Sequence, residues 1–97
     1  MAKGYLVVTY RKINSQEKWG AYAKIAGVAI PKLGGKFIIR GMPVKTYEKG
    51  MNERVVIVEF DSVQKAMAAH DSAEYAEALR ALGDGADRDM RVVEGVA

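Results

Sequence analysis

The chain has 97 residues, 49% of them hydrophobic and 28% charged, with a net charge of +3. This length suits one small domain over residues 1–97 with a single core. The absence of cysteine and the single histidine exclude disulfides, thiolate chemistry and a multi-histidine metal site within one chain. No apolar run approaches the roughly 18 residues that cross a bilayer, and no signal peptide pattern is present. We therefore expect a cytoplasmic protein that makes no membrane contact.

The two halves of the chain carry opposite charge. Residues 1–50 sum to +8 and residues 51–97 to −5. The lysines of the first half are spaced singly and form no basic stripe. The pattern therefore favours a solvated surface whose charges complement each other across packed halves or subunits, and not nucleic-acid binding. We expect no nucleic-acid partner.

The first third of the chain predicts a strand followed by a helix. Residues 3–11 are rich in β-branched and aromatic types. Asn14 and Glu17 then have the spacing of a capping box. Apolar residues at helical spacing continue to Leu33, where two glycines at 34–35 are a helix stop.

The middle of the chain predicts two further strands and a second helix. Residues 36–41, "KFIIRG", form the first of these strands, and residues 44–48, "VKTYE", are a candidate continuation of it. Residues 54–60, "RVVIVEF", give the clearest strand pattern in the chain. Asp61 and Gln64 are spaced as a capping box and open the second helix.

A last strand at residues 88–96 completes the order β-α-β-β-α-β. This order predicts an α+β fold, a ferredoxin-like sandwich with one antiparallel four-stranded sheet and two helices on one face. The runs "YLVV", "FII" and "VVIV" are apolar at successive positions, which is typical of strands buried on both faces. We therefore predict a homodimer whose two sheets face each other as an α+β barrel.

The stretch "AAHDSAEYAEALR", residues 68–80, contains the only histidine. The apolar stripe changes phase after Asp71, and Asp71 with Glu74 forms a further capping box, with Ser72 the next-best cap. A new helical segment is predicted there. His70 and Tyr75 are left over: each is either a hydrogen-bonded, partly buried side chain or a member of a site, with His70 a candidate proton carrier.

Two charged residues interrupt apolar strands. Strict alternation puts Arg40 on the face of Ile38, and Glu59 on the face of Ile57. The pair is either a structural ion pair or part of a ligand site. Tyr10, Tyr22 and Trp19 are candidates to line the same cleft.

The whole chain resembles the family classed as domain of unknown function 1330, within the dimeric α+β barrel superfamily. The matching segments are "KGYLVV", "GGKFIIRG", "RVVIVEFDS", "KAMAAHDSAEYAEALR" and "VVEG". The resemblance implies a ferredoxin-like subunit and a barrel dimer. It implies no catalytic role for any residue. The following residues match the family motif without an assigned function: Arg40, Glu59, Ser72, Tyr75 and Arg80.

The superfamily implied by this resemblance includes cofactor-free monooxygenases of quinol-like aromatics, lactone isomerases, haem enzymes and small-molecule sensing domains. His70 is the one available axial ligand for haem and lies beside a helix cap. We therefore expect no cofactor and no metal.

Two functional hypotheses remain open. In the first, a cleft between sheet and helices binds or transforms a small aromatic or carboxylate metabolite. Glu59 or His70 would move a proton, and the ligand-binding set would be Arg40, Tyr10, Tyr22, Ser72 and Tyr75. In the second, the dimer is a non-catalytic ligand-binding or scaffolding module.

Overall fold

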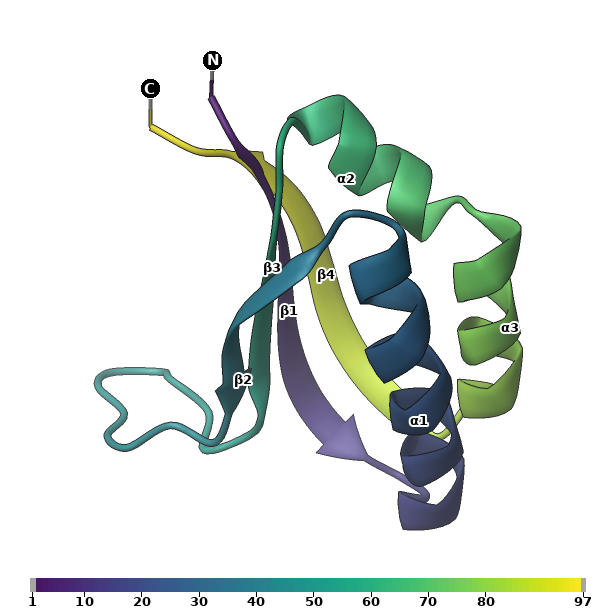
Figure 1. Ribbon diagram of the computed structural model, residues 1–97. Helices are drawn as coiled ribbons and strands as arrows, with labels where there is room; N and C mark the ends of the chain where they lie inside the picture. The colour runs from purple at the N-terminus through teal and green to yellow at the C-terminus, as the bar shows by residue number, and fades with distance from the viewer. Residues whose placement is uncertain (1, 97) are drawn as a thin grey trace.

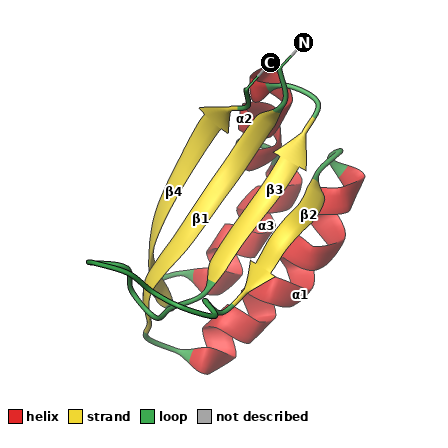
Figure 2. Ribbon diagram, turned by 90° about the vertical axis from the view of Figure 1, so that its left-hand side faces the viewer, coloured by secondary structure: helices red, strands yellow, loops and turns green. Residues whose placement is uncertain are grey.

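The computed structural model describes residues 2–96. Its elements, in chain order, are β1 (Gly4–Ile13), α1 (Gln16–Lys32), β2 (Lys36–Gly41), β3 (Val55–Phe60), α2 (Val63–His70), α3 (Ala73–Leu82) and β4 (Ala86–Glu94). The strands form one antiparallel sheet in the order β2-β3-β1-β4. All three helices lie on one face of this sheet (Figure 1), and Figure 2 shows the opposite face without a helix over it. The α+β class and the four-stranded antiparallel sheet are confirmed.

Each helix begins at a serine. The caps are Ser15, Ser62 and Ser72, and each hydroxyl accepts a hydrogen bond from the backbone N–H three residues further on. Sequence reasoning placed all three preferred caps one residue too early: the third at Asp71, ahead of the next-best choice Ser72, and the first two at Asn14 and Asp61. Those side chains have other partners: the Asn14 amide donates to the carbonyl of Asp84, and the Asp61 carboxylate pairs with Lys3 and Lys65.

The helical break predicted near Asp71 is present. α2 ends at His70, Asp71 is its C-cap, and α3 begins at Ala73 with Ser72 as its N-cap. The new segment turns Tyr75, Ala78 and Leu82 toward the core. The phase change in the apolar pattern therefore marked two helices in place of one.

The two glycines after α1 end the helix as predicted. Gly34 has a φ of 90°, a left-handed conformation that side chains rarely adopt. The N–H of Gly34 donates to the carbonyl of Pro31, and the N–H of Gly35 donates to that of Ile30. These two bonds form a Schellman motif, which satisfies the last carbonyls of α1 and turns the chain into β2.

The core lies between the helices and the sheet. Leu6, Val8 and Tyr10 of β1 alternate inward, as do Val58 and Phe60 of β3. Five alanines of the helices are also buried, and their small side chains allow close packing: Ala26, Ala29, Ala66, Ala69 and Ala78. No helix within residues 2–96 has the length and apolar character to cross a lipid bilayer.

The predicted continuation of β2 over residues 44–48 is wrong. Residues 42–54 form a connection that projects from the sheet on the side away from the helices (Figure 1). Pro43 has no N–H to give to a ladder, and Glu48 has a φ of 51°, which is incompatible with a strand. The segment also has no partner, because β3 begins only at Val55.

Candidate functional site

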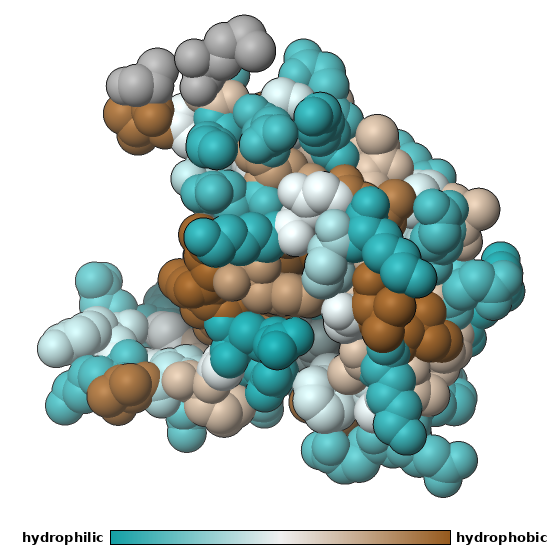
Figure 3. Space-filling view, viewed as in Figure 1, coloured by the Kyte–Doolittle hydropathy of each residue, from teal (hydrophilic) through white to brown (hydrophobic). Residues whose placement is uncertain are grey.

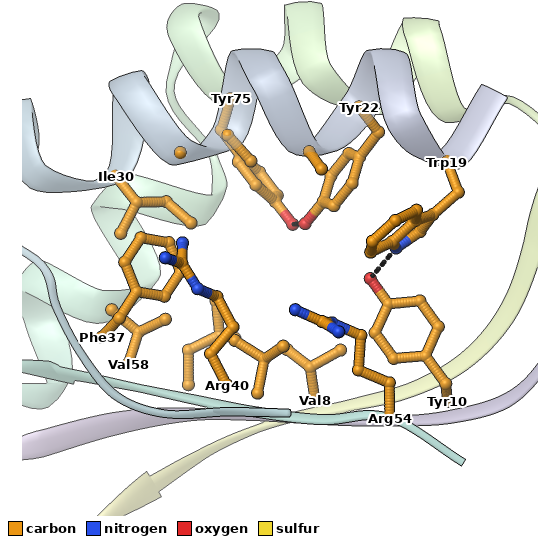
Figure 4. A pocket seen from close by; sticks show the side chains of 15 residues that line it. Val8, Tyr10, Trp19, Tyr22, Ile30, Phe37, Arg40, Arg54, Val58 and Tyr75 are labelled. Atoms are coloured by element: carbon orange, nitrogen blue, oxygen red, sulfur yellow. Dashed lines mark hydrogen bonds between the residues drawn. The ribbon is translucent and has the colours of Figure 1, made fainter. Parts of the chain in front are cut away.

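A cavity of about 230 Å³ lies between α1 and the helix-facing side of the sheet. Its walls are mainly apolar, and their aromatic and charged side chains are Tyr10, Trp19, Tyr22, Phe37, Arg40, Arg54 and Tyr75. Figure 4 shows α1 above this space and the strands below it, with both guanidinium groups rising from the sheet side. In the space-filling view, apolar side chains gather in the hollow above the projecting connection (Figure 3).

Arg40 reaches this cavity because β2 contains an irregularity. The register with β3 shifts between Phe37 and Ile39, so Phe37 pairs with Val58 and Arg40 pairs with Val56. Both partners are on the helix-facing side, and Arg40 therefore shares that face with Phe37. Its guanidinium carbon lies 4.5 Å from the centre of the Phe37 ring, a cation–π contact that orients the side chain.

Arg54 supplies a second guanidinium from the other end of the projecting connection. It precedes β3 in phase with Val56 and Val58, which point toward the helices. Its guanidinium carbon lies 5.1 Å from the centre of the Trp19 ring. The Trp19 indole N–H in turn donates to the Tyr10 hydroxyl over 3.1 Å. This side of the cavity is therefore a fixed stack of arginine and aromatic groups.

The far wall of the cavity holds two tyrosine hydroxyls in contact. Tyr22 of α1 and Tyr75 of α3 have hydroxyl oxygens 2.7 Å apart, and Arg88 of β4 donates to the Tyr22 oxygen over 2.9 Å. Burial raises the pKa of the Tyr22 phenol well above its ordinary value. Tyr22 is therefore a neutral hydrogen-bonding group and not a base.

The cavity has a positive and apolar character. Its lining residues include two arginines and neither a carboxylate nor an imidazole. Within residues 2–96, neither Arg40 nor Arg54 forms an ion pair with a carboxylate. Such a site favours a ligand that brings its own negative charge.

Glu59 and His70, the two candidate proton carriers, do not converge with Arg40 in this cavity. Glu59 pairs with Tyr5 of β1 and Lys36 of β2 in the sheet register and lies on the helix-free face, where the Tyr5 hydroxyl donates to it over 3.0 Å. That bond raises the pKa of Tyr5. Arg40 and Glu59 therefore lie on opposite faces and do not form the structural ion pair that was one of the two alternatives, because the shift after Phe37 reverses the alternation of β2.

His70 and Ser72 also lie outside the lining of the cavity. The His70 ring nitrogen Nδ1 is 3.0 Å from a carboxylate oxygen of the neighbouring Asp71. The Ser72 hydroxyl accepts from the Tyr75 N–H and donates to the carbonyl of Ala69. Ser72 is therefore a helix cap. Five of the eight candidate residues line the cavity: Tyr10, Trp19, Tyr22, Arg40 and Tyr75.

Residues 2–96 contain no group of three or more histidine, cysteine, aspartate or glutamate side chains that could hold a metal ion. The cavity offers phenol hydroxyls, guanidinium charge and aromatic surface.

The sequence also places this architecture within a known family. Residues 3–96 match the family described as Domain of unknown function (DUF1330). The chain belongs to this family. No functionally curated protein matches it.

Solved structures share the fold of this DUF1330 chain at low sequence identity. The RPA0582 protein of unknown function from Rhodopseudomonas palustris superposes with a TM-score of 0.74 at 18% identity, covering 99% of this chain and 84% of that one. A Nitrosomonas europaea protein provisionally named an antibiotic biosynthesis monooxygenase gives 0.62 at 12% identity, covering 98% and 90%. A protein from Thermobifida fusca described as dimeric and ferredoxin-like gives 0.62 at 17%, covering 95% and 90%. The ferredoxin-like fold is shared by all three.

Three residues around the cavity of this DUF1330 chain were missing from the sequence-based site: Phe37, Arg54 and Arg88. Arg54 carried a usable signal, because it alternates in phase with Val56 and Val58 at the start of a clear strand. Arg88 pairs with Tyr10 across β1 and β4, a relationship between the two ends of the chain that no local pattern contains.

Proposed function

We propose that this cavity binds a small anionic aromatic metabolite. One observation carries the proposal: Arg40 and Arg54 face an aromatic-walled cavity that contains no carboxylate to neutralise them. A guanidinium presents parallel N–H donors that match a carboxylate, and both arginines are held against aromatic rings before any ligand arrives. The aromatic walls would contact the flat body of the ligand.

The test compares benzoate with benzamide, its neutral counterpart of nearly the same shape. We expect benzoate to bind and benzamide to bind at least about tenfold more weakly, because a charge-assisted hydrogen bond contributes roughly 1.5–3 kcal/mol. Arg40→Gln and Arg54→Gln should each weaken benzoate binding about tenfold. Calorimetric titration measures both constants, and emission of Trp19, the only tryptophan, provides a second signal from the cavity wall.

Arg80→Gln is the matched control, because Arg80 is exposed on α3 and pairs with Glu77 away from the cavity. This variant should bind benzoate as the unmodified chain does. Equal affinity of the unmodified chain for benzoate and benzamide would contradict the role given to the two arginines.

A second candidate is cofactor-free oxygenation of a bound quinol. It is supported by the fold likeness to the protein provisionally named an antibiotic biosynthesis monooxygenase and by the aromatic lining of the cavity. The quinol would supply the electrons: one oxygen atom of O₂ would enter the ring, the other would leave as water, and a hydroxyquinone would form. Oxygen uptake with 2,5-dihydroxybenzoate tests this, and uptake no faster than in a protein-free solution would remove the candidate.

We also infer that the helix-free face of the sheet pairs with a second copy of the chain. Apolar side chains lie on that face beside the charged groups of Glu59, Asp89 and Arg91. Ile39 and Val93 are 47% and 45% exposed, and Val7 and Ile57 stand opposite each other. An apolar sheet face of this kind favours burial, and a second copy offers the same surface through two-fold symmetry. The dimeric protein from Thermobifida fusca has the same fold.

A further inference from the structure

The contact between Tyr22 and Tyr75 leaves one hydroxyl hydrogen without a protein acceptor. A guanidinium has donors only, so Arg88 must donate to the Tyr22 oxygen, 2.9 Å away. A single hydrogen can lie between the two phenol oxygens, which are 2.7 Å apart. Two phenols carry two hydroxyl hydrogens, so one remains.

No other group within residues 2–96 takes this hydrogen. The side-chain bonds of the two hydroxyls are those to each other and to Arg88. Tyr75 and Tyr22 are only 1% and 7% exposed, so bulk water has little access. Both residues line the cavity, and Figure 4 shows their hydroxyls side by side, directed toward the space that Arg40 and Arg54 enter from the sheet. The remaining hydrogen is therefore available to an occupant of the cavity.

The hydrogen bond from Arg88 determines which of the two phenols donates to the other and which has its hydrogen free for a ligand. A hydrogen bond accepted by the Tyr22 oxygen polarises its own O–H and makes it a stronger donor. Tyr22 then donates to Tyr75, and the Tyr75 hydrogen is left for the cavity. Burial raises the pKa of Tyr22, so its hydrogen is retained at neutral pH.

We propose that Tyr75, polarised through the chain from Arg88 to Tyr22, donates a hydrogen bond to a second oxygen of the ligand, on the side remote from its negatively charged group. The ligand class is then a flat acid with a hydrogen-bond acceptor, such as a carbonyl oxygen, at the end opposite the carboxylate. This inference rests on the proposed binding of an anionic aromatic molecule. It adds a requirement that the two arginines alone do not impose.

The proposal predicts discrimination between acids that differ only in this oxygen. A ligand without an acceptor leaves the Tyr75 hydroxyl desolvated and unpaired. 4-Acetylbenzoate and 4-isopropenylbenzoate both carry a planar substituent of nearly equal shape, and only the first has the acceptor oxygen. We expect the unmodified chain to bind 4-acetylbenzoate about tenfold more tightly.

Calorimetric titration of both acids against the unmodified chain and three variants tests the assignment. Tyr75→Phe removes only the hydroxyl and should abolish the preference by weakening 4-acetylbenzoate alone. Tyr22→Phe breaks the link to Arg88 and should reduce the preference in part. Tyr47→Phe, at an exposed tyrosine outside this cavity, should keep it in full.

The possible failures differ. If both acids bind the unmodified chain equally, the Tyr75 donor is refuted while the anion site stands. If neither acid binds, both proposals are refuted. If Tyr75→Phe lowers the melting temperature but leaves the ratio of affinities unchanged, the hydroxyl has a structural role only, and the donor is again refuted; the ratio in the unmodified chain remains decisive if a variant fails to fold.

Discussion

Arg40 and Glu59 lie on neighbouring strands but on opposite faces of the sheet. Arg40 enters the cavity beneath α1, whereas Glu59 accepts a hydrogen bond from Tyr5 on the helix-free face. The two charges are therefore separated by the sheet itself and belong to different surfaces of the molecule.

This separation predicts that Arg40 and Glu59 contribute independently to stability. In a double-mutant cycle of Arg40→Ala and Glu59→Gln, the changes in the free energy of unfolding should add within about 0.5 kcal/mol. The cycle of Tyr5→Phe with Glu59→Gln is the positive control, since these side chains are bonded, and it should show coupling. Urea denaturation of the variants supplies the free energies, and coupling between Arg40 and Glu59 above about 1 kcal/mol would argue for an ion pair.

Pairing of two sheets predicts that a charge at the centre of the helix-free face separates the copies. We expect sedimentation velocity to show a dimer for the unmodified chain and a monomer for Ile57→Lys, because an uncompensated buried lysine is strongly unfavourable. Val28→Lys is the control: Val28 is exposed on α1, on the other side of the molecule. A monomeric unmodified chain at micromolar concentration would refute the dimer.

Gly27 offers a way to fill the cavity without disturbing the core. It lines the cavity within α1, and an added Cβ would meet no atom within 4 Å. Gly20 lies in the same helix with equally open space but outside the cavity. Gly→Ala at either position should raise the free energy of unfolding by about 0.5–1 kcal/mol through helix propensity.

Leucine substitutions at Gly27 and Gly20 distinguish an effect on ligand binding from an effect on stability. Gly27→Leu should abolish benzoate binding because its side chain occupies the ligand space, whereas Gly20→Leu should retain it. Titration of both variants with benzoate measures the difference. Retained binding in a folded Gly27→Leu variant would place the ligand elsewhere.

The lowered pKa of Asp89 predicts a contribution to stability that is lost in acid. Hydrogen bonds from Arg91, at 2.9 and 3.0 Å, are the main reason that the pKa of Asp89 lies below its ordinary value, with Arg11 assisting from 3.4 Å. A carboxyl whose pKa is lowered on folding stabilises the protein above its unfolded pKa of about 3.9, and this contribution disappears as the pH falls through the folded value.

The difference in unfolding free energy between the unmodified chain and Asp89→Asn should therefore be constant near neutral pH and shrink in acid. Denaturation at a series of pH values measures it. Arg91→Ala should shift the carbon NMR titration of Asp89 toward higher pH, and an unchanged titration would show that Arg91 is not the main partner.

Local patterns were sufficient for much of the fold. The phase change at Asp71 located the break between α2 and α3, and the two glycines at 34–35 located the end of α1. Both features depend on residues within one or two helical turns. The caps differed by one residue, because in each pair of adjacent polar residues both side chains can cap and tertiary partners decide which one does.

The cavity was less predictable because it depends on one backbone irregularity and on distant pairs. Phe37, Ile38 and Ile39 are all apolar, so alternation could not reveal where β2 gains its extra residue and which face Arg40 takes. The group of Tyr22, Tyr75 and Arg88 joins α1, α3 and β4. Only the assembled fold brings these three elements together.

The projecting connection can vary independently of the charged groups of the cavity. Arg40 and Arg54 stand near its two ends and are held by the sheet and by aromatic rings, while the connection itself contributes no residue to the core. None of residues 42–53 lines the cavity. Insertions, deletions or substitutions along this stretch would therefore change the surface that it forms and leave the charged groups of the cavity in place. Evolution or engineering can vary this surface without rebuilding the groups proposed to bind a ligand.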